Sequence, residues 1–253
     1  MHKASHVRGV VRFLAFTVWT LALGGFWLCI RFVFPPDARS SGGALILSRW
    51  SRGVRCIVGL RLEVSGKPLR CPVLLASNHI SYLDIAVIAS EVPVVFVSKS
   101  EVAGWPLLGP LAKAIGTIFL ERDQPRSVIE VAERMGKLLK SGQSIAMFPE
   151  GTTKKESGIS DLRPALFEPA LRAEIPIQGV SLEYIPLSKS DNAEAAWYGE
   201  ATFLPHFYRF LCGGRWVARL KFNEAGFYAD RHEAAQMLRT WMESSLVFGK
   251  QVA

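Results

Sequence analysis

Apolar positions follow two different patterns along the chain, and the change between them falls near residue 60. Residues 13–30 form an uncharged, mostly apolar stretch with Arg12 before it and Arg31 after it. That length is just sufficient for a helix to cross the hydrocarbon core of a bilayer. From residue 61 onward, short apolar runs alternate with amphipathic segments. We therefore predict membrane-anchoring helices in residues 1–60 and a folded domain in residues 61–253.

The N-terminal apolar stretch has a second interpretation, a cleaved secretory signal, because Lys3, Arg8 and Arg12 precede it. The stretch is longer than the apolar core of an ordinary signal, and no clear Ala-x-Ala cleavage site follows it, which favours a retained anchor. Arginines flank both ends, so the distribution of charge does not fix the orientation. A helix that spans the membrane and a helix that enters and returns on one side both remain open.

A second helix is predicted over residues 45–60, where Arg49, Arg52 and Arg55 recur at every third position and apolar residues occupy another face. A basic amphipathic helix of this kind tends to lie in the headgroup plane of a membrane, with its arginines near lipid phosphate. The alternative is a surface helix packed on the domain. The two interpretations are compatible with one another.

Six apolar runs in the second part of the chain have the length and the bounding residues of buried β-strands. They are residues 73–76, 93–97, 117–120, 144–148, 175–182 and 215–222. Alternation of such strands with helices predicts an α/β fold, with a mixed, largely parallel sheet flanked by helices and preceded by the membrane-associated segment. Ligands of such folds usually bind at the carboxyl ends of the strands.

The last predicted helix begins at a capping pattern formed by Asp230 and Glu233. Its helical period predicts an inner face made of Ala234, Met237, Leu238 and Trp241.

Composition narrows the possible partners. The net charge is +8 and 49% of the residues are hydrophobic. A basic surface suits anionic partners, and an apolar chain without nucleic-acid-binding signatures favours anionic membrane lipids or phosphorylated substrates over nucleic acid. The four cysteines contain no Cys-x-x-Cys pair, which argues against a metal site.

The most informative polar segment, residues 78–84, follows the first predicted strand and leads into a helix. His79 and Asp84 lie five residues apart in it. A histidine at such a junction can act as a general base when a carboxylate fixes its tautomer and stabilises the imidazolium. The sequence contains no Gly-x-Ser-x-Gly elbow, so the base would activate a hydroxyl brought by the substrate. The structural alternative is a histidine at a strand end beside an acid that caps a helix.

Three further polar segments follow predicted strands. Lys99 lies after the second strand and Arg122 after the third, and residues 150–153 follow the fourth. Two cations, a glycine and small hydroxyls suit a phosphate site, because arginine is a two-pronged donor and glycine admits close backbone approach. Each segment also has a purely structural explanation, as a solvated ion pair, a turn or a surface lysine.

In combination, the segments resemble the glycerolipid acyltransferases of the 1-acyl-sn-glycerol-3-phosphate acyltransferase (PlsC) type. Residues 78–84 are similar to the first motif of that family, 97–101 to its lysine-bearing stretch, 116–122 to the second motif, 148–153 to the third and 175–177 to the fourth. The motifs occur in the family's order between residues 73 and 182. Residues 197–199 and His206 also resemble a segment found in some bacterial members.

The resemblance implies an enzyme that moves a fatty acyl group from acyl-CoA or acyl carrier protein to the free hydroxyl of a lysolipid, most simply 1-acyl-sn-glycerol-3-phosphate, without a further cofactor or metal. It implies that His79 is the general base and Asp84 its orienting acid. It implies that the acceptor is bound by Asn78, Lys99, Arg122, Glu150, Gly151, Thr152 and Thr153. It also implies that Pro176 and Ile177 line the acyl-donor side. The implied location is the inner membrane of a bacterium, with the catalytic domain on the cytoplasmic side.

Departures from the family pattern bear on the acceptor. Thr153 stands where the third motif more often has arginine or serine, and Gln178 and Gly179 replace the end of the fourth motif and its second proline. A lyso-ornithine lipid or another lysophospholipid is therefore an alternative acceptor. Two other functions use the same residues: a lipid-binding protein that has lost the chemistry, and a hydrolase or transacylase.

Overall fold

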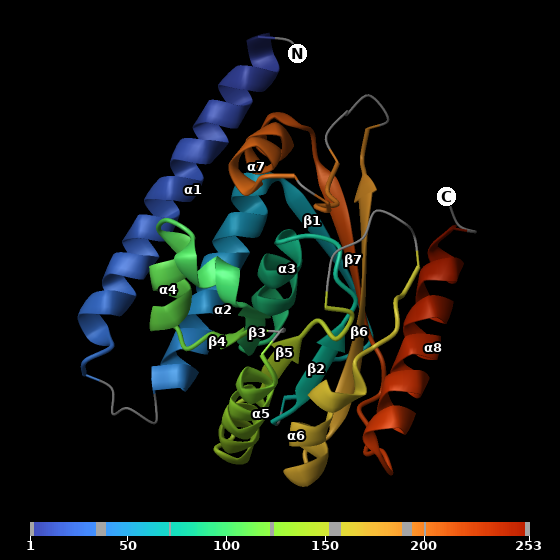
Figure 1. Ribbon diagram of the computed structural model, residues 1–253. Helices are drawn as coiled ribbons and strands as arrows, with labels where there is room; N and C mark the ends of the chain where they lie inside the picture. Colours follow the sequence, from blue (N-terminus) through green and yellow to red (C-terminus); the bar gives the residue numbers. More distant parts are fainter. Residues whose placement is uncertain are drawn as a thin grey trace.

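A sheet of seven strands, in the order β1-β7-β6-β2-β5-β3-β4, organises the chain (Figure 1). The computed structural model describes residues 3–33, 39–70, 72–121, 124–151, 158–188, 194–199 and 201–250. The strands are β1 (Leu60–Ser65), β2 (Leu74–Ser77), β3 (Val95–Lys99), β4 (Ile118–Leu120), β5 (Ile145–Met147), β6 (Ile177–Pro186) and β7 (Trp216–Phe222). Only β6 and β7 pair antiparallel; the other neighbours are parallel. The predicted fold class and all six predicted strands are confirmed.

β1 is the strand that the sequence pattern missed. It pairs in parallel with β7 at one edge of the sheet, and most of its side chains are partly or fully exposed. A strand with little buried surface lacks the apolar run by which the other strands are found.

Helices cover both faces of the sheet (Figure 1). One face carries α1 (Lys3–Ile30), α2 (Arg39–Val58), α3 (Leu83–Glu91) and α7 (Phe203–Cys212), with α4 (Leu108–Ala114) at its margin. The other face carries α5 (Pro125–Lys140), α6 (Glu168–Arg172) and α8 (Arg231–Lys250). Single 3₁₀ turns occur at Ser100–Gly104 and Pro164–Leu166.

Each face has its own core, and alternate residues of the central strand enter different ones. Leu75 of β2 packs with Val87 of α3, whereas Leu74 and Ala76 pack with Met135 of α5 and its neighbours. Strand side chains alternate between the two faces of a sheet, so an unbroken apolar strand requires helices on both sides.

The carboxyl ends of β2, β5, β3 and β4 meet at one edge of the sheet, because these four strands are mutually parallel. The four polar segments predicted as functional follow β2, β3, β4 and β5 in chain order. Strand order also makes β5 and β6 the two neighbours of β2. Side chains from β5 and β6 therefore have direct access to the loop that follows β2.

α1 is hydrogen-bonded to the rest of the fold near both of its ends. The Arg8 and Arg12 guanidinium groups donate to Cys212 O at 2.6 Å and Leu211 O at 3.1 Å, at the end of α7. Trp27 donates to Ala114 O at 2.8 Å. The N-terminal helix is thus packed along the domain over most of its length.

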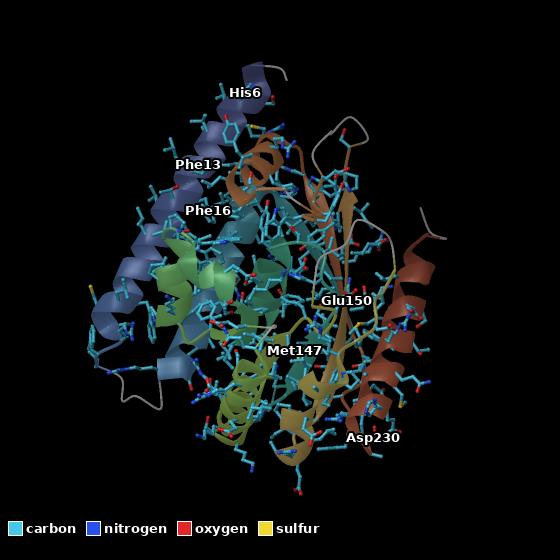
Figure 2. All side chains as sticks on the ribbon, viewed as in Figure 1. His6, Phe13, Phe16, Met147, Glu150 and Asp230 are labelled. Carbon is cyan, nitrogen blue, oxygen red and sulfur yellow. The ribbon has the colours of Figure 1, made fainter. Side chains whose placement is uncertain are left out.

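The opposite face of α1 is apolar and exposed. Phe16 faces the domain and is 8% exposed, whereas Phe13 is 37% exposed (Figure 2). Leu14 and Val18 are exposed by 58% and 66%. Within the described residues, one helix, Ser5–Ile30, has the length and composition needed to cross a membrane.

α2 lies between α1 and α3 and contributes to the main core. Val54 and Val58 are buried in the cluster that also contains Val87, and Arg52 donates to Ser90 O of α3 at 3.0 Å. The predicted division after residue 60 falls just inside β1, and side chains from both parts share one core. The packed-helix interpretation of residues 45–60 is confirmed.

α8 begins as its capping pattern predicts, since Asp230 Oδ1 accepts hydrogen bonds from the backbone N–H groups of His232 and Glu233. Leu238 and Trp241 pack against β6 at Gly179, where a side chain on the strand would collide with both. The prediction for Met237 was wrong: its side chain is 55% exposed.

Candidate active site

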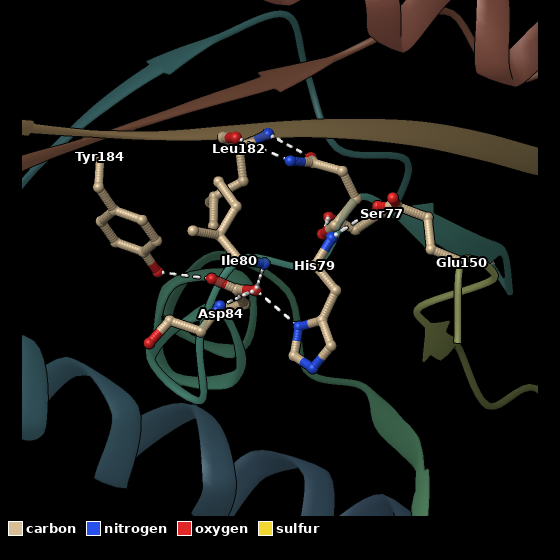
Figure 3. A network of polar contacts seen from close by, with 9 residues as sticks. Ser77, His79, Ile80, Asp84, Glu150, Leu182 and Tyr184 are labelled. Atoms are coloured by element: carbon tan, nitrogen blue, oxygen red, sulfur yellow. Dashed lines mark hydrogen bonds and ion pairs between the residues drawn. The ribbon is translucent and has the colours of Figure 1, made fainter. Parts of the chain in front are cut away.

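His79 and Asp84 form a hydrogen-bonded pair in the loop between β2 and α3 (Figure 3). The distance from His79 Nδ1 to Asp84 Oδ2 is 2.7 Å. The same oxygen accepts the backbone N–H groups of Ile80 at 2.7 Å and Ser81 at 3.0 Å, and the Asp84 side chain is fully buried in the first turn of α3. Backbone donors and a helix N-terminus both stabilise a carboxylate at this position.

The pairing decides which nitrogen of His79 is available for chemistry. A carboxylate only accepts hydrogen bonds, so Nδ1 carries the proton and Nε2 keeps its lone pair. The His79 side chain is 19% exposed and lines a cavity of about 440 Å³. Among the described residues, Asp84 is the one hydrogen-bond partner of the ring, so Nε2 is free to accept a proton.

Two aromatic residues that the sequence analysis did not single out support this pair. The Phe148 ring stacks on the imidazole at a centroid distance of 3.9 Å and an angle of 15°. The Tyr184 hydroxyl donates to Asp84 Oδ1 at 2.8 Å (Figure 3). Burial and the charge of Asp84 raise the pKa of Tyr184 well above its ordinary value, so the hydroxyl stays a donor.

Asn78 and Glu150, both predicted to bind the acceptor, have their polar atoms engaged inside the protein. Asn78 is 3% exposed and is bonded to the backbone of Leu182 on β6. Glu150 Oε1 accepts the His79 N–H at 3.1 Å, and Oε2 accepts the Ser160 N–H at 2.9 Å. A carboxylate with both oxygens occupied holds loops together and has no donor for a phosphate.

Lys99 lies in the wall of the cavity that His79 lines, whereas Gly151 packs against Arg163. Lys99 is exposed at the end of β3 and lines the cavity with His79. Gly151 has a φ of +82°, a conformation that glycine adopts without strain, and the Arg163 guanidinium lies against it where a Cβ would be. Arg122, Thr152 and Thr153 lie outside the described residues.

Pro176 and Ile177, predicted to line the acyl-donor side, are not brought to His79. β6 runs parallel to β2, with Ile177 level with Leu74 and Val180 level with Ser77. The beginning of β6 therefore lies at the other edge of the sheet, and Ile177 is fully buried in the core beneath α8.

A segment after β6 covers the His79 loop from outside. Trp197 N donates to Ile80 O at 3.0 Å. Tyr82, at the start of α3, donates to His206 Nδ1 at 2.9 Å, and His206 Nε2 donates to Ala196 O at 3.0 Å. Burial lowers the pKa of His206 below its usual value, which keeps Nδ1 free to accept the tyrosine proton. These contacts bring Trp197 and His206 against the loop that contains the first motif.

Most of the wall of the 440 Å³ cavity is apolar or aromatic, and a second cavity adjoins it. The second one has a volume of about 160 Å³, lies between α1, α2, α3, α4 and α7, and has an almost wholly apolar lining. The cavities share wall residues, namely Tyr82, Ile85, Phe96, Ser98, Val102, Trp105 and Phe203. The His79 imidazole thus lines a space whose walls suit hydrocarbon.

Comparisons with known proteins identify the family to which the chain is related. A family model described as "Acyltransferase" matches residues 61–183. The chain is 34% identical over 196 residues to the lyso-ornithine lipid O-acyltransferase of Rhizobium meliloti, covering 72% of this chain and 67% of that protein. The corresponding protein of Pseudomonas aeruginosa is 33% identical, with 70% and 69% covered. The chain belongs to the family of lysolipid acyltransferases.

Other relatives of this acyltransferase carry the name 1-acyl-sn-glycerol-3-phosphate acyltransferase. The protein of that name from Neisseria meningitidis is 33% identical over 135 residues, 53% of each chain. Among solved structures, the 1-acyl-sn-glycerophosphate acyltransferase PlsC of Thermotoga maritima superposes with a TM-score of 0.70 over 96% of this chain and 95% of that one. At 16% identity, this last likeness concerns the fold.

Proposed function

We propose that His79 takes the proton from the free hydroxyl of a bound lysolipid, and that the resulting oxygen nucleophile attacks the carbonyl carbon of an acyl thioester. The new C–O bond forms as the C–S bond breaks, and the imidazolium returns its proton to the departing sulfur. Asp84 holds the ring and stabilises its positive charge between these two transfers. A positioned base contributes about 10²–10⁴-fold to such a reaction, and bringing donor and acceptor together contributes more.

The observation that carries this proposal is the free Nε2 of His79 in the wall of a mostly apolar cavity. In the part of the chain that the structure describes, no serine or cysteine is hydrogen-bonded to the ring, so a protein nucleophile has no place in the arrangement. A substrate hydroxyl fills that role, and a lipid alcohol matches the apolar walls.

We favour a lyso-ornithine lipid as the acceptor, with 1-acyl-sn-glycerol-3-phosphate as the second candidate. Three relatives with the first name match 70% or more of this chain, two of them at 33–34% identity, whereas one relative with the second name does so, at 30% identity. Lys99 and Glu101 are the oppositely charged side chains among the described residues of the cavity wall, a balance that suits a headgroup with one carboxylate and one amine. The relatives from Neisseria and the cation at Lys99 favour the phosphate-bearing candidate.

The acyl donor in this proposal is acyl-CoA or acyl carrier protein, as the family resemblance implies. Both present a thioester at the end of a long, flexible, anionic carrier, which suits a protein of net charge +8. The 160 Å³ apolar cavity beside the site offers space for part of a hydrocarbon chain. Pro176 and Ile177 have no part in this version of the donor site.

We further propose that α1 anchors the enzyme in one leaflet of the membrane, on the cytoplasmic side of a bacterial inner membrane. The bonds from Arg12 to Leu211 O and from Trp27 to Ala114 O support a helix that stays beside its domain. A helix with one bonded face and one apolar exposed face lies naturally in the interface. The site would then open where lysolipid is dissolved and soluble donors arrive.

The deciding experiment offers the purified full-length protein a panel of lysolipids with each donor, and follows both thiol release and acylated product. The panel contains lyso-ornithine lipid, 1-acyl-sn-glycerol-3-phosphate and lysophosphatidylethanolamine. We expect thiol release that depends on the acceptor and is fastest with lyso-ornithine lipid. His79→Ala is expected to lower it by at least about 10²-fold while binding to vesicles is retained.

Three other results would each contradict a different part of the proposal. Thiol release without any acceptor would identify a hydrolase. The absence of release with every donor and acceptor would favour a lipid-binding protein without chemistry. A rate for His79→Ala within a few-fold of the unsubstituted protein would show that His79 is not the general base.

A further inference from the structure

The two oxygens of the Asp84 carboxylate accept hydrogen bonds from different parts of the chain. Oδ2 accepts from His79 Nδ1 and from the N–H groups of Ile80 and Ser81, all within the same loop. Oδ1 accepts from Tyr184, which lies one hundred residues further along the chain on β6. Figure 3 shows the tyrosine approaching the carboxylate from the side opposite to the imidazole.

We propose that Tyr184 is a positioning residue for the acyl transfer proposed above: its hydroxyl fixes the Asp84 carboxylate with Oδ2 toward His79 and shares the negative charge of the carboxylate. The inference rests on the proposed function, since it concerns the base of that reaction. Tyr184 touches neither substrate nor reacting atoms and acts through Asp84.

The geometric part of the argument concerns the rotation of the carboxylate. Asp84 is fully buried, so water does not replace a missing donor at Oδ1. With Tyr184 in place, each oxygen has its own donors, and a turn of the carboxylate plane breaks bonds on both sides. Without that hydroxyl, the carboxylate plane is held through Oδ2 alone, and the imidazole is oriented less precisely.

The electrostatic part concerns how strongly Asp84 attracts the proton on His79. A donor at Oδ1 draws negative charge away from Oδ2, and removing it leaves a carboxylate that attracts an imidazolium more strongly. In the variant, this stronger attraction would stabilise the imidazolium relative to the neutral ring, a change that the pH profile of the reaction detects. Tyr184 therefore weakens the attraction between the carboxylate and the imidazolium.

Other charged and titratable groups around the pair are spread over several elements and stay constant when only Tyr184 is changed. Glu150, on the loop after β5, faces the backbone of His79, and Tyr82 lies on the α3 side. Lys99 and Glu101 line the same cavity as the imidazole. Glu183, next to Tyr184, points to Arg219 of β7 at 3.9 Å.

A purely structural role for this tyrosine is separable, because the strand has independent supports. β6 pairs with β2 on one side and with β7 on the other, where Tyr184 is opposite Ala218. Tyr184→Phe keeps the ring and its packing and removes only the oxygen. Tyr208→Phe is the matched control, since the Tyr208 hydroxyl contacts His6 on α1, remote from the loop.

The test is the pH profile of kcat/KM for acceptor-dependent thiol release in the full-length protein. For Tyr184→Phe we expect the midpoint of the acidic limb to move upward by roughly half a unit to one unit, and the plateau to fall roughly tenfold. Tyr208→Phe should match the unsubstituted protein in both. A lower plateau with an unmoved midpoint, or an unchanged profile, would overturn the proposal.

A second measurement separates this inference from the proposed function. Diethylpyrocarbonate modifies neutral imidazole, so its rate at His79, followed by peptide mass spectrometry across a pH series, reports protonation without any substrate. Tyr184→Phe is expected to move that midpoint upward as well. If the unsubstituted protein transfers no acyl group, the proposed function fails, but this measurement still tests the role of Tyr184. A midpoint that does not move in Tyr184→Phe would refute that role.

Discussion

Asn78 and Leu182 exchange two hydrogen bonds, from Asn78 Nδ2 to Leu182 O at 2.9 Å and from Leu182 N to Asn78 Oδ1 at 2.8 Å. The side chain thus imitates a neighbouring strand and continues the pairing of β2 with β6 by one more step. Because His79 follows directly, this amide fixes the point at which the loop with the base leaves the sheet. The predicted acceptor-binding role of Asn78 has to be tested against this positioning role.

Substitution of Asn78 by alanine is expected to lower the free energy of unfolding by about 1–3 kcal/mol, since two buried backbone groups of Leu182 lose their partners. The rate constant kcat should fall because His79 is no longer held, while the KM for lysolipid changes little. Thermal melting and steady-state kinetics measure both effects. An increase in KM with an unchanged kcat would instead support a direct role of Asn78 in acceptor binding.

Phe148 is expected to contribute through its stacking on His79. A stacked aromatic pair is worth about 0.5–1.5 kcal/mol, so Phe148→Leu should lower kcat by roughly two- to tenfold. Phe227→Leu is a suitable control, because that ring is 74% exposed. Equal losses in the two variants would show that the ring above the imidazole has no particular effect.

Loss of the cation at Lys99 should weaken acceptor binding. We expect Lys99→Ala to raise the KM for lysolipid roughly tenfold or more, the value of one charge-assisted hydrogen bond, and to change the KM for the donor much less. Arg122→Ala, predicted to act on the same headgroup, should behave likewise. Lys113→Ala, on the exposed face of α4, serves as the control. A larger effect on the donor would contradict the assignment.

Arg12 is expected to hold α1 against the end of α7. Its Nη1 donates to Leu211 O at 3.1 Å and to Gly213 O at 3.0 Å, carbonyls at a helix C-terminus that favour a cation. Arg12→Ala should lower the melting temperature and speed proteolysis between α1 and α2. Arg126→Ala removes a side chain that is 90% exposed and should change neither. Membrane binding is expected to persist, since the exposed face of α1 is intact.

The buried His206 predicts a pH dependence of stability. Its pKa is lowered in the folded protein, mainly by burial, so the unfolded chain binds a proton more readily. The contribution of His206 to stability is therefore complete above about pH 6.5, the usual value of an unfolded histidine, and is lost as the pH falls through the lower folded value. His206→Gln offers a donor and an acceptor without titrating. It should therefore make the melting temperature depend less on pH in this range. An identical slope in the variant would assign the dependence to other groups.

Local spacing in the sequence determined the elements and the central pair. Apolar runs of the right length predicted six strands, because a strand buried on both faces needs an unbroken apolar run. The five-residue interval from His79 to Asp84 predicted their contact, since a strand end followed by one turn of helix brings two such side chains together. Parallel strands then placed Lys99 and Glu150 at the same edge of the sheet.

Only the tertiary structure decided what surrounds that pair. Tyr184 and Leu182 come from a strand one hundred residues away, and Phe148 from the other neighbour of β2, so their contacts depend on the order of strands in the sheet. The same order placed Ile177 at the far edge, and it gave the edge strand β1 too little buried surface to be found in advance. Sequence patterns report which face of an element is buried, whereas the identity of the partner on that face is set by packing among segments far apart in the chain.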